Sequence, residues 1–422
     1  MTDNAFAVNM EPIATVERAY RASLKLGITK GVDRSRAVLA MAQALQNSVN
    51  DILEANTLDL EASREMAVPD LILDWLKLTP ERLQATIEIL ERLGELPDPL
   101  RRVRNADYQL QDSQTYCQLM PLGVIALIYE AFPQLGAIAA GLCIKTGNSL
   151  ILRGSSEASN SNAAIASALQ SALEEVEIPA DSLQLLAADS GGTIVRDLVT
   201  QDRYINLVIP YGRPSMVQQI MRQSTAPVLK TAMGNCYLYW SVSGGLEMVR
   251  SMILDSHQSQ PDPVNAIEKV LIHRSSQPSA LVTLWNSLKE KGFEIRGDAE
   301  LTQAFTDLKL AADSEWNQSY LKKVVAFKIV DSLEAAIDWI NQHSSGHADC
   351  IVTESYQESR YFALRVNSAS TYINASSRFS RNPSRGDSVF LGMSNQKGHR
   401  RGLISLETLT TVKHIVQGNG RL

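Results

Sequence analysis

The stretch GVIALIYEAFPQLGAIAAGLCIKTGNSLILRG, residues 123–154, decides the fold class. It contains two short apolar runs, and a longer segment of small and apolar residues lies between them after Pro133. Two continuous apolar runs separated by a helix-length segment are typical of buried parallel strands joined by a crossover helix. The stretch therefore predicts part of a doubly wound α/β sheet.

The same alternation extends along the chain on both sides of residue 250. The runs LQLLAA, INLVIPYG and SMVQQIMRQ continue the first set, and a second set runs from AIEKVLIHR (266–274) to STYINAS (370–376). Strands that alternate with helices in this way indicate βαβ units. We expect two α/β domains.

The region before residue 123 has two other patterns. Residues 9–94 repeat apolar residues at three- and four-residue steps, which predicts helices, and Thr79 and Pro80 fit the cap and first position of one of them. Between Pro99 and Pro121 polar and apolar residues alternate, which predicts an exposed strand pair or arm.

Composition limits the classes of function. The 422 residues include 40 Lys and Arg against 46 Asp and Glu, so the charge offers no attraction for nucleic acid or an anionic membrane. The start lacks the pattern of a signal peptide, and no run approaches the roughly 18 apolar residues of a membrane span. We expect a cytoplasmic protein with no nucleic-acid partner and no membrane span.

Cysteines and histidines give no sign of a metal site. The cysteines are Cys117, Cys143, Cys236 and Cys350, and the histidines are His257, His273, His343, His347, His399 and His414. None has metal-ligand spacing, so we expect no metal and no catalytic histidine. Cys236 lies in the apolar and aromatic run TAMGNCYLYW, which predicts a buried, unreactive thiol.

Two turns are candidates for binding a phosphate. KTGNSLILRGSSEAS (145–159) and IPYGRPS (209–215) each place a Gly-containing turn between a strand and a helix, with Arg153 and Gly212 at the strand ends. Ligands of doubly wound folds bind at the carboxyl ends of strands. The alternative is that both are ordinary βα turns.

Five motifs follow one another along most of the chain: MPLGVIALIYEAFP, LCIKTGNSLILRG, DRYINLVIPYG, INASSRF and SLETLTT. In this order and spacing they resemble the γ-glutamyl-phosphate reductase family, also called glutamate-5-semialdehyde dehydrogenase, of the aldehyde dehydrogenase superfamily. The resemblance implies an aldehyde dehydrogenase-like α/β fold with a doubly wound cofactor-type domain, a second α/β catalytic-type domain and a small β oligomerisation flap.

The resemblance also implies domain boundaries. The cofactor-binding-type domain is expected in residues 1–106 and 121–250, the catalytic-type domain in 251–377, the oligomerisation arm in 107–120 and 401–422, and a loop returning to the cleft in 378–400. It implies a homodimer or tetramer, and the alternating pattern of the arm agrees with a strand that needs a partner. The alternative is that the arm packs on its own subunit.

The family's reaction needs a cysteine at a position where this chain has another residue. The resemblance implies proline synthesis, in which a cysteine thiolate displaces phosphate from an acyl phosphate and NADPH then delivers hydride. In the stretch QSQPDPVNAIEKVLI (258–272) the family's cysteine precedes the asparagine, so Asn265 and Glu268 match and Val264 occupies the nucleophile's position. Valine has no lone pair with which to attack.

Other positions implied by the family are also altered. Phe132 stands where relatives have arginine, and Gln134 stands at the asparagine position, whereas the substrate-cleft positions Glu130, Asn265 and Asn374 are kept. The positions implied to bind cofactor are degenerate, with Ser156 in place of lysine, Arg213 in place of glycine and Phe390 in place of a ribose-binding glutamate. The full set at these cofactor positions is Arg153, Gly154, Ser156, Pro210, Gly212 and Phe390.

Two functions of different class follow. The first is a non-catalytic homologue that binds, scaffolds or regulates. The second is an active NADPH-dependent glutamate-5-semialdehyde dehydrogenase that uses an unconventional site. Losing the nucleophile of such an enzyme costs on the order of 10⁴-fold or more in rate, which favours the first. NADPH is the cofactor implied by the family, and we expect its binding here to be weak or absent.

Overall fold

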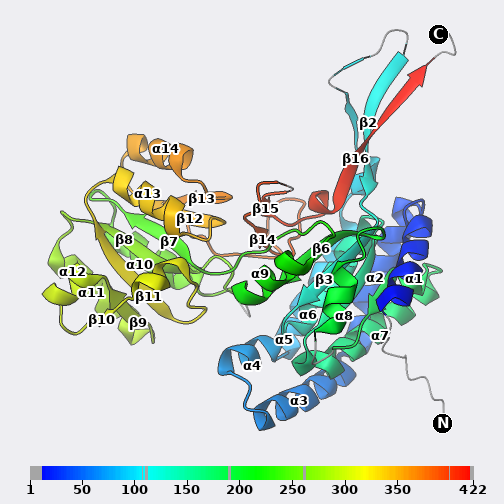
Figure 1. Ribbon diagram of the computed structural model, residues 1–422, viewed down its shortest axis with the longest axis horizontal. Coiled ribbons are helices and arrows are strands. Elements are labelled where there is room, and N and C mark those ends of the chain that lie inside the picture. Colours follow the sequence, from blue (N-terminus) through cyan, green and yellow to red (C-terminus); the bar gives the residue numbers. More distant parts are fainter. Residues whose placement is uncertain are drawn as a thin grey trace. The chain divides into compact units, whose positions relative to one another are not determined.

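A computed structural model describes residues 12–106, 108–109, 113–188, 192–259, 263–398 and 400–418. The chain forms two compact units (Figure 1). Unit 1 comprises Met1–Lys230, Arg381–Leu391 and Ile404–Leu422, and unit 2 comprises Thr231–Ser380 and Gly392–Leu403. Each unit is built around its own parallel sheet, so the predicted α/β fold with parallel sheets is confirmed.

Unit 1 contains a four-stranded parallel sheet in the order β5-β4-β3-β6. The strands are β3 (Val124–Tyr129), β4 (Ser149–Gly154), β5 (Leu183–Leu185) and β6 (Ile205–Tyr211). The stretch that decides the fold supplies β3, α6 (Pro133–Lys145) and β4. All six residues of β3 are buried, as expected for a strand with both faces covered.

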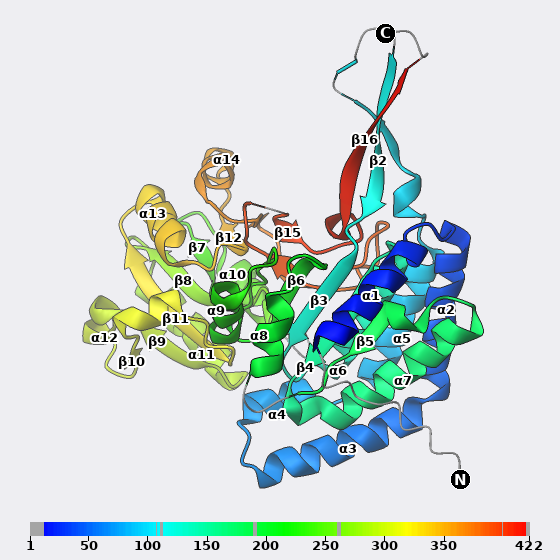
Figure 2. The same ribbon diagram turned by 45° about the vertical axis from the view of Figure 1, so that its right-hand side comes forward.

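Helices cover both faces of this sheet. Apolar residues of α1 (Pro12–Leu26), α8 (Thr193–Val199) and α9 (Pro214–Gln223) share one core cluster with β3, β4 and β6. In Figure 2, α1 runs beside β3 in a similar direction. The other helices are α2 (Gly31–Asn47), α3 (Val49–Glu65), α4 (Asp70–Leu76), α5 (Pro80–Glu95), α6 and α7 (Ser159–Glu175). Thr79 accepts a hydrogen bond from the Arg82 amide at the start of α5, as its sequence predicts.

The predicted strand pair forms an antiparallel ribbon of unit 1 (Figure 1). β2 (Ser113–Pro121) pairs along its whole length with β16 (Thr410–Gly418), and β1 (Val103–Asn105) flanks β2. Residues 107, 110–112 and 419–422 of the predicted arm lie outside the described residues.

Unit 2 contains a parallel sheet in the order β10-β9-β11-β8-β7-β12-β13. Its strands are β7 (Cys236–Trp240), β8 (Ile267–His273), β9 (Glu294–Gly297), β10 (Lys309–Leu310), β11 (Val324–Val330), β12 (Ala348–Val352) and β13 (Ser370–Ile373). Two short strands, β14 (Met393–Ser394) and β15 (Gly402–Leu403), pair separately.

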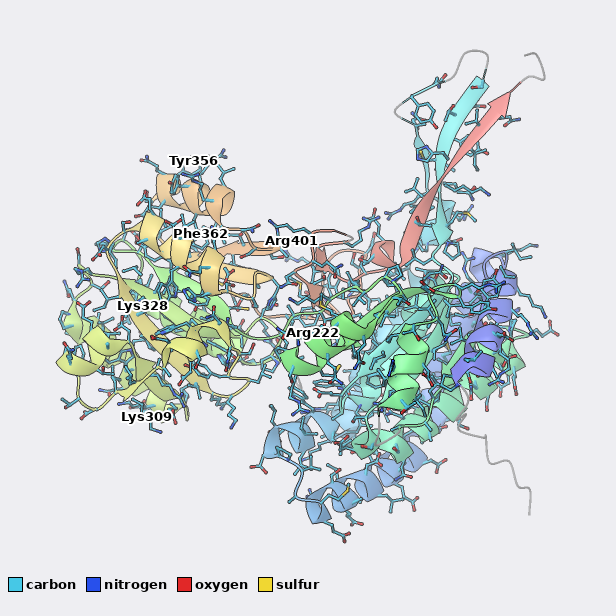
Figure 3. The ribbon with its side chains drawn as sticks, in the orientation of Figure 1. Arg222, Lys309, Lys328, Tyr356, Phe362 and Arg401 are labelled. Carbon is cyan, nitrogen blue, oxygen red and sulfur yellow. The ribbon has the colours of Figure 1, made fainter. Side chains whose placement is uncertain are left out.

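Helices also cover both faces of the sheet of unit 2. One core cluster takes its helical residues from α10 (Leu246–Ser256), α11 (Pro278–Glu290) and α12 (Ala299–Ala304), and the other from α13 (Leu333–His343) and α14 (Tyr356–Arg365). Phe362 of α14, labelled in Figure 3, is fully buried, whereas Tyr356 at the start of that helix is exposed. Among the described residues no helix is long and apolar enough to cross a membrane.

The units differ from the expected boundaries at three places. Residues 231–250 belong to unit 2 because β7 hydrogen-bonds to β8 and β12 of the second sheet. The expected loop 378–400 is divided between the units, with Arg381–Leu391 in unit 1. Residues 401–403 of the expected arm belong to unit 2, where β15 pairs with β14. Local sequence patterns do not report which unit a segment contacts.

Candidate functional site

The carboxyl ends of three strands of unit 1 bring together most of the positions expected to bind cofactor. Tyr129, the last residue of β3, is level with Gly154 at the end of β4 and with Tyr211 at the end of β6. The turns after these strands therefore begin at one edge of the sheet. Glu130, Arg153, Gly154, Ser156, Pro210 and Gly212 all lie in these turns or strand ends.

The end of β4 is packed too closely for a larger residue at Gly154. A Cβ at this position would collide with the side-chain amide of Asn162 in α7. The Tyr129 hydroxyl donates to the Asn162 Oδ1 at 2.9 Å, and burial raises the pKa of Tyr129. Gly154 is thus explained by packing, while Ser156 is exposed and its hydroxyl donates to Glu157.

The N-terminus of α7 is occupied by a carboxylate of the protein. Asp59 of α3 is buried and accepts hydrogen bonds from the amides of Asn160 (3.0 Å) and Ser161 (2.8 Å) and from both of their side chains. A carboxylate at a helix N-terminus satisfies the free amides and the positive end of the helix dipole. This turn, a candidate phosphate site from its sequence, therefore uses its helix amides internally.

Glu130 and Arg213 form an ion pair at the ends of β3 and β6. Arg213 donates its amide (2.7 Å), Nε (3.0 Å) and NH2 (2.8 Å) to the Glu130 carboxylate. The Glu130 side chain is 12% exposed and that of Arg213 is 48% exposed. Hydrogen bonding to Glu130 is the main reason that the pKa of Arg213 is raised. Glu130, expected in a substrate cleft, is held by the turn after β6.

A side chain at Gly212 would require Glu130 or Met216 to move. Its φ of 153° is one that L residues with a Cβ rarely adopt, and a Cβ would lie 2.6 Å from the Glu130 Oε2 and 2.8 Å from the Met216 Cε. The space beside the Gly212 backbone is thus filled by the protein's own side chains. These residues do not fit a dinucleotide whose pyrophosphate approaches the backbone at this turn.

Phe132 and Gln134 are buried at the start of α6. Phe132 stacks on Trp75 at 4.6 Å between ring centroids and meets Tyr211 edge-on at 5.6 Å, which makes it a core residue. Gln134 is 6% exposed, and its Oε1 accepts no hydrogen bond from the residues that the structure describes. A buried acceptor without a donor costs free energy. The side-chain oxygen of Gln134 could therefore accept a hydrogen bond at the start of α6.

Arg381–Leu391 attaches to the same edge of unit 1. The Arg381 NH2 donates to the Tyr211 hydroxyl at 2.7 Å, and Arg92 of α5 hydrogen-bonds to Asn382 and the carbonyls of Pro383 and Gly386. The Phe390 amide donates to the Arg381 carbonyl at 2.9 Å. The loop therefore brings Phe390 into unit 1, but an aromatic ring offers no carboxylate to a ribose hydroxyl.

Val264 lies in a turn before β8 of unit 2. Its side chain is buried, with 1% exposure, and its carbonyl accepts a hydrogen bond from the Gly234 amide at 2.9 Å. Asn265 donates to the Tyr372 hydroxyl at 3.3 Å, and its Oδ1 accepts no hydrogen bond from any described residue. Residues 260–262 of the stretch that contains this turn are outside the described residues.

Asn374 is linked to this turn only through its neighbours. Its side chain bonds both backbone groups of Thr353, donating to the carbonyl at 2.7 Å and accepting from the amide at 2.9 Å. Three residues later, the Ser377 hydroxyl donates to the Asn265 carbonyl at 2.8 Å. Asn374 is thus used as a brace between β12 and β13.

The cysteines of unit 2 offer no available thiol. Cys236 and Cys350 are fully buried, and burial raises the pKa of both thiols. Cys236 Sγ lies 3.4 Å from the His347 Nε2, but burial lowers the pKa of His347 to about 4, so the imidazole is neutral near pH 7. A neutral, buried pair of this kind does not generate a thiolate. The prediction that Cys236 is structural agrees with this geometry.

Glu268, which matches the family pattern, is a structural brace. Its buried carboxylate accepts hydrogen bonds from the amides of Asn235 (3.0 Å), Tyr320 (2.7 Å) and Leu321 (2.9 Å). Lys269 lies 3.7 Å from it and over the Tyr320 ring. Sequence reasoning matched Glu268 but could not find its partners, which lie 33 to 53 residues away. Among the described residues, no three His, Cys, Asp or Glu gather as metal ligands.

Comparison with known proteins places the whole chain in one family. Residues 7–234 match the aldehyde dehydrogenase family model. The chain is 57% identical over 410 residues to γ-glutamyl phosphate reductase 2 of Synechocystis and 38% identical over 408 residues to γ-glutamyl phosphate reductase of Gloeobacter violaceus, with 97% of each chain covered. The crystal structure of γ-glutamyl phosphate reductase from Thermotoga maritima is 31% identical with a TM-score of 0.88, covering 98% of this chain and 99% of that one. The protein therefore belongs to the γ-glutamyl phosphate reductase family of proline biosynthesis, within the aldehyde dehydrogenase superfamily.

Proposed function

We propose that this chain is a non-catalytic member of its family, which acts by binding, scaffolding or regulation. Its relatives are oxidoreductases, and their superfamily typically binds a nicotinamide cofactor. The observation that supports the proposal is Val264, a buried aliphatic side chain at the position that the resemblance assigns to the nucleophile. Covalent catalysis needs an atom that attacks the acyl carbon while phosphate leaves, and a methyl group cannot do so.

Among the described residues, the cysteines of unit 2 and Ser377 do not offer a replacement. Cys236 and Cys350 are buried thiols with raised pKa values. The Ser377 hydroxyl donates to the backbone carbonyl of Asn265. In the described part of the chain this bond gives Ser377 no base that could remove its proton. The edge of unit 1 supports the same proposal, because the fit of a dinucleotide at Gly212 is poor.

In this proposal the protein is a homo-oligomer and resides in the cytoplasm. The ribbon supports assembly, since β16 pairs with β2 on one side and no other described strand pairs with its opposite edge. Val412 and Val416 of β16 are about half exposed, and an unpaired strand edge with apolar side chains favours association with another chain.

The test is an assay of the reverse reaction. Glutamate semialdehyde, phosphate and NADP⁺ are mixed with the full chain, and NADPH is followed by its absorbance. The Gloeobacter violaceus relative serves as the positive control. We expect no turnover above a sample without protein. Turnover by the wild-type chain would reject the proposal in favour of an active reductase with an unconventional site.

A further inference from the structure

The Glu130–Arg213 ion pair lies at the topological switch point of the unit 1 sheet. The chain leaves β3 toward β4 and then β5, and it returns from β5 to β6 on the other side of β3. The order of strands therefore reverses between β3 and β6. In open α/β sheets, ligands bind in the crevice outside the carboxyl ends of the strands at this point. Glu130 directly follows β3, and Arg213 follows β6 after one glycine.

The pair has the geometry of an anion bound to a guanidinium and a helix start. The Glu130 carboxylate takes both Arg213 guanidinium hydrogen bonds and the Arg213 amide, and Arg213 is the residue before the first turn of α9. Glu157, in the turn after β4, adds a second negative charge close enough to raise the pKa of Arg213. The guanidinium therefore interacts with groups from the ends of all three strands that form the edge.

We infer that Glu130 and Arg213 form an internal lock that excludes dinucleotides from the crevice of unit 1. The Glu130 carboxylate takes the hydrogen bonds that a ligand phosphate would need, and the Arg213 side chain stands where the resemblance implies a glycine. A dinucleotide would have to break the ion pair and would then face the negative charges of Glu130 and Glu157. The lock concerns binding alone and does not depend on Val264 or on the proposed lack of activity.

The test is calorimetric titration of NADPH into the full chain and three variants. Arg213→Gly removes the guanidinium and its bulk, and we expect NADPH to bind at least tenfold more tightly than to the wild type. Arg213→Lys is the matched control, because an ammonium at this position still pairs with Glu130, and we expect it to bind as weakly as the wild type. Glu130→Gln frees the Arg213 guanidinium for a phosphate, and we expect this variant to bind NADPH more tightly than the wild type. Inorganic pyrophosphate is titrated into the same proteins as a second probe.

Two results would overturn the lock. One is sub-micromolar binding of NADPH by the wild type, and the other is equal binding by the wild type and by correctly folded Arg213→Gly. Circular dichroism and the unfolding midpoint show whether Arg213→Gly is folded. If it is not folded, Glu130→Gln takes its place, and NADPH binding by Glu130→Gln equal to that of the wild type would overturn the lock. Turnover by the wild type would reject the proposed function, whereas equal binding by Arg213→Gly would reject only the lock.

Discussion

The Nε2 atom of His347 lies 2.8 Å from the carbonyl oxygen of Val264. A carbonyl only accepts hydrogen bonds, so this nitrogen carries the proton and the imidazole holds the backbone at Val264. Ser345 lies 2.9 Å from the other ring nitrogen. The histidine is therefore a buried, neutral support for the turn. It does not provide a positive charge that would activate a thiol at residue 264.

The first prediction is that His347 makes the fold sensitive to acid. Burial lowers its pKa from 6.5 to about 4, so its neutral form is favoured in the folded state. The stabilisation is present above pH 6.5 and is lost as pH falls from 6.5 to 4, amounting to roughly 3 kcal/mol at about 1.4 kcal/mol per pKa unit. In urea unfolding at pH 7.5, 5.5 and 4.5, the difference in free energy of unfolding between the wild type and His347→Gln should shrink as the pH falls.

Asp349 must be separated from this effect. Burial raises its pKa to about 6, which has the opposite sign, because stability is present below its ordinary pKa of 3.8 and is lost as pH rises through 6. Both chains carry Asp349, so its contribution largely cancels in the difference between them. A difference between the wild type and His347→Gln that stays constant with pH would contradict the assignment to His347.

The second prediction concerns Val264→Cys. Cysteine is close to valine in volume, so the stability of the variant should change by about 1 kcal/mol or less. We expect no turnover in the reverse assay, because the added thiol is buried beside a neutral His347 and the crevice of unit 1 remains blocked by Arg213. Val264→Ala serves as the control without a thiol. Turnover by the cysteine variant alone would show that one atom is all that the site lacks.

The third prediction is that Glu268 contributes to stability. Glu268→Ala leaves three amides without their acceptor, two of them buried and that of Tyr320 partly buried, and at about 1–3 kcal/mol per unsatisfied group the loss of stability should be about 3 kcal/mol or more. Glu268→Gln keeps one acceptor oxygen, so its free energy of unfolding in guanidinium should lie between those of the wild type and Glu268→Ala. A loss below 1 kcal/mol in the alanine variant would mean that water or a shifted backbone satisfies these amides.

Local patterns predicted the elements of the fold well, because the information lies within each segment. The apolar runs of β3 and β4 and the capped start of α5 are examples. The division between units was less accessible, since β7 is assigned by its pairing with β8 and β12. A strand's own residues specify its type but not its neighbours.

The sequence allows a proposal about the site where a single position is concerned, but it does not show which distant residues meet. Val264 can be recognised from its place beside Asn265, as a resemblance implies. The contact between Glu130 and Arg213 joins residues 83 apart, and that between Asp59 and Ser161 joins residues 102 apart. Only the fold brings these groups within hydrogen-bond distance.

The fourth prediction is that Cys117 is the thiol that reacts in the native protein. It is partly exposed on β2, and its Sγ lies 3.5 Å from the His414 Nδ1 across the ribbon, whereas Cys143, Cys236 and Cys350 are buried with raised pKa values. Thiolate availability controls reaction with an aromatic disulfide reagent. We expect one thiol per chain to react rapidly before unfolding and four after it, and none to react rapidly in Cys117→Ser. Fast reaction of more than one thiol in the native wild type would mean that the cores around the other three open readily. No fast reaction at all would indicate that assembly through the ribbon covers Cys117, and dilution to dissociate the oligomer should then restore it.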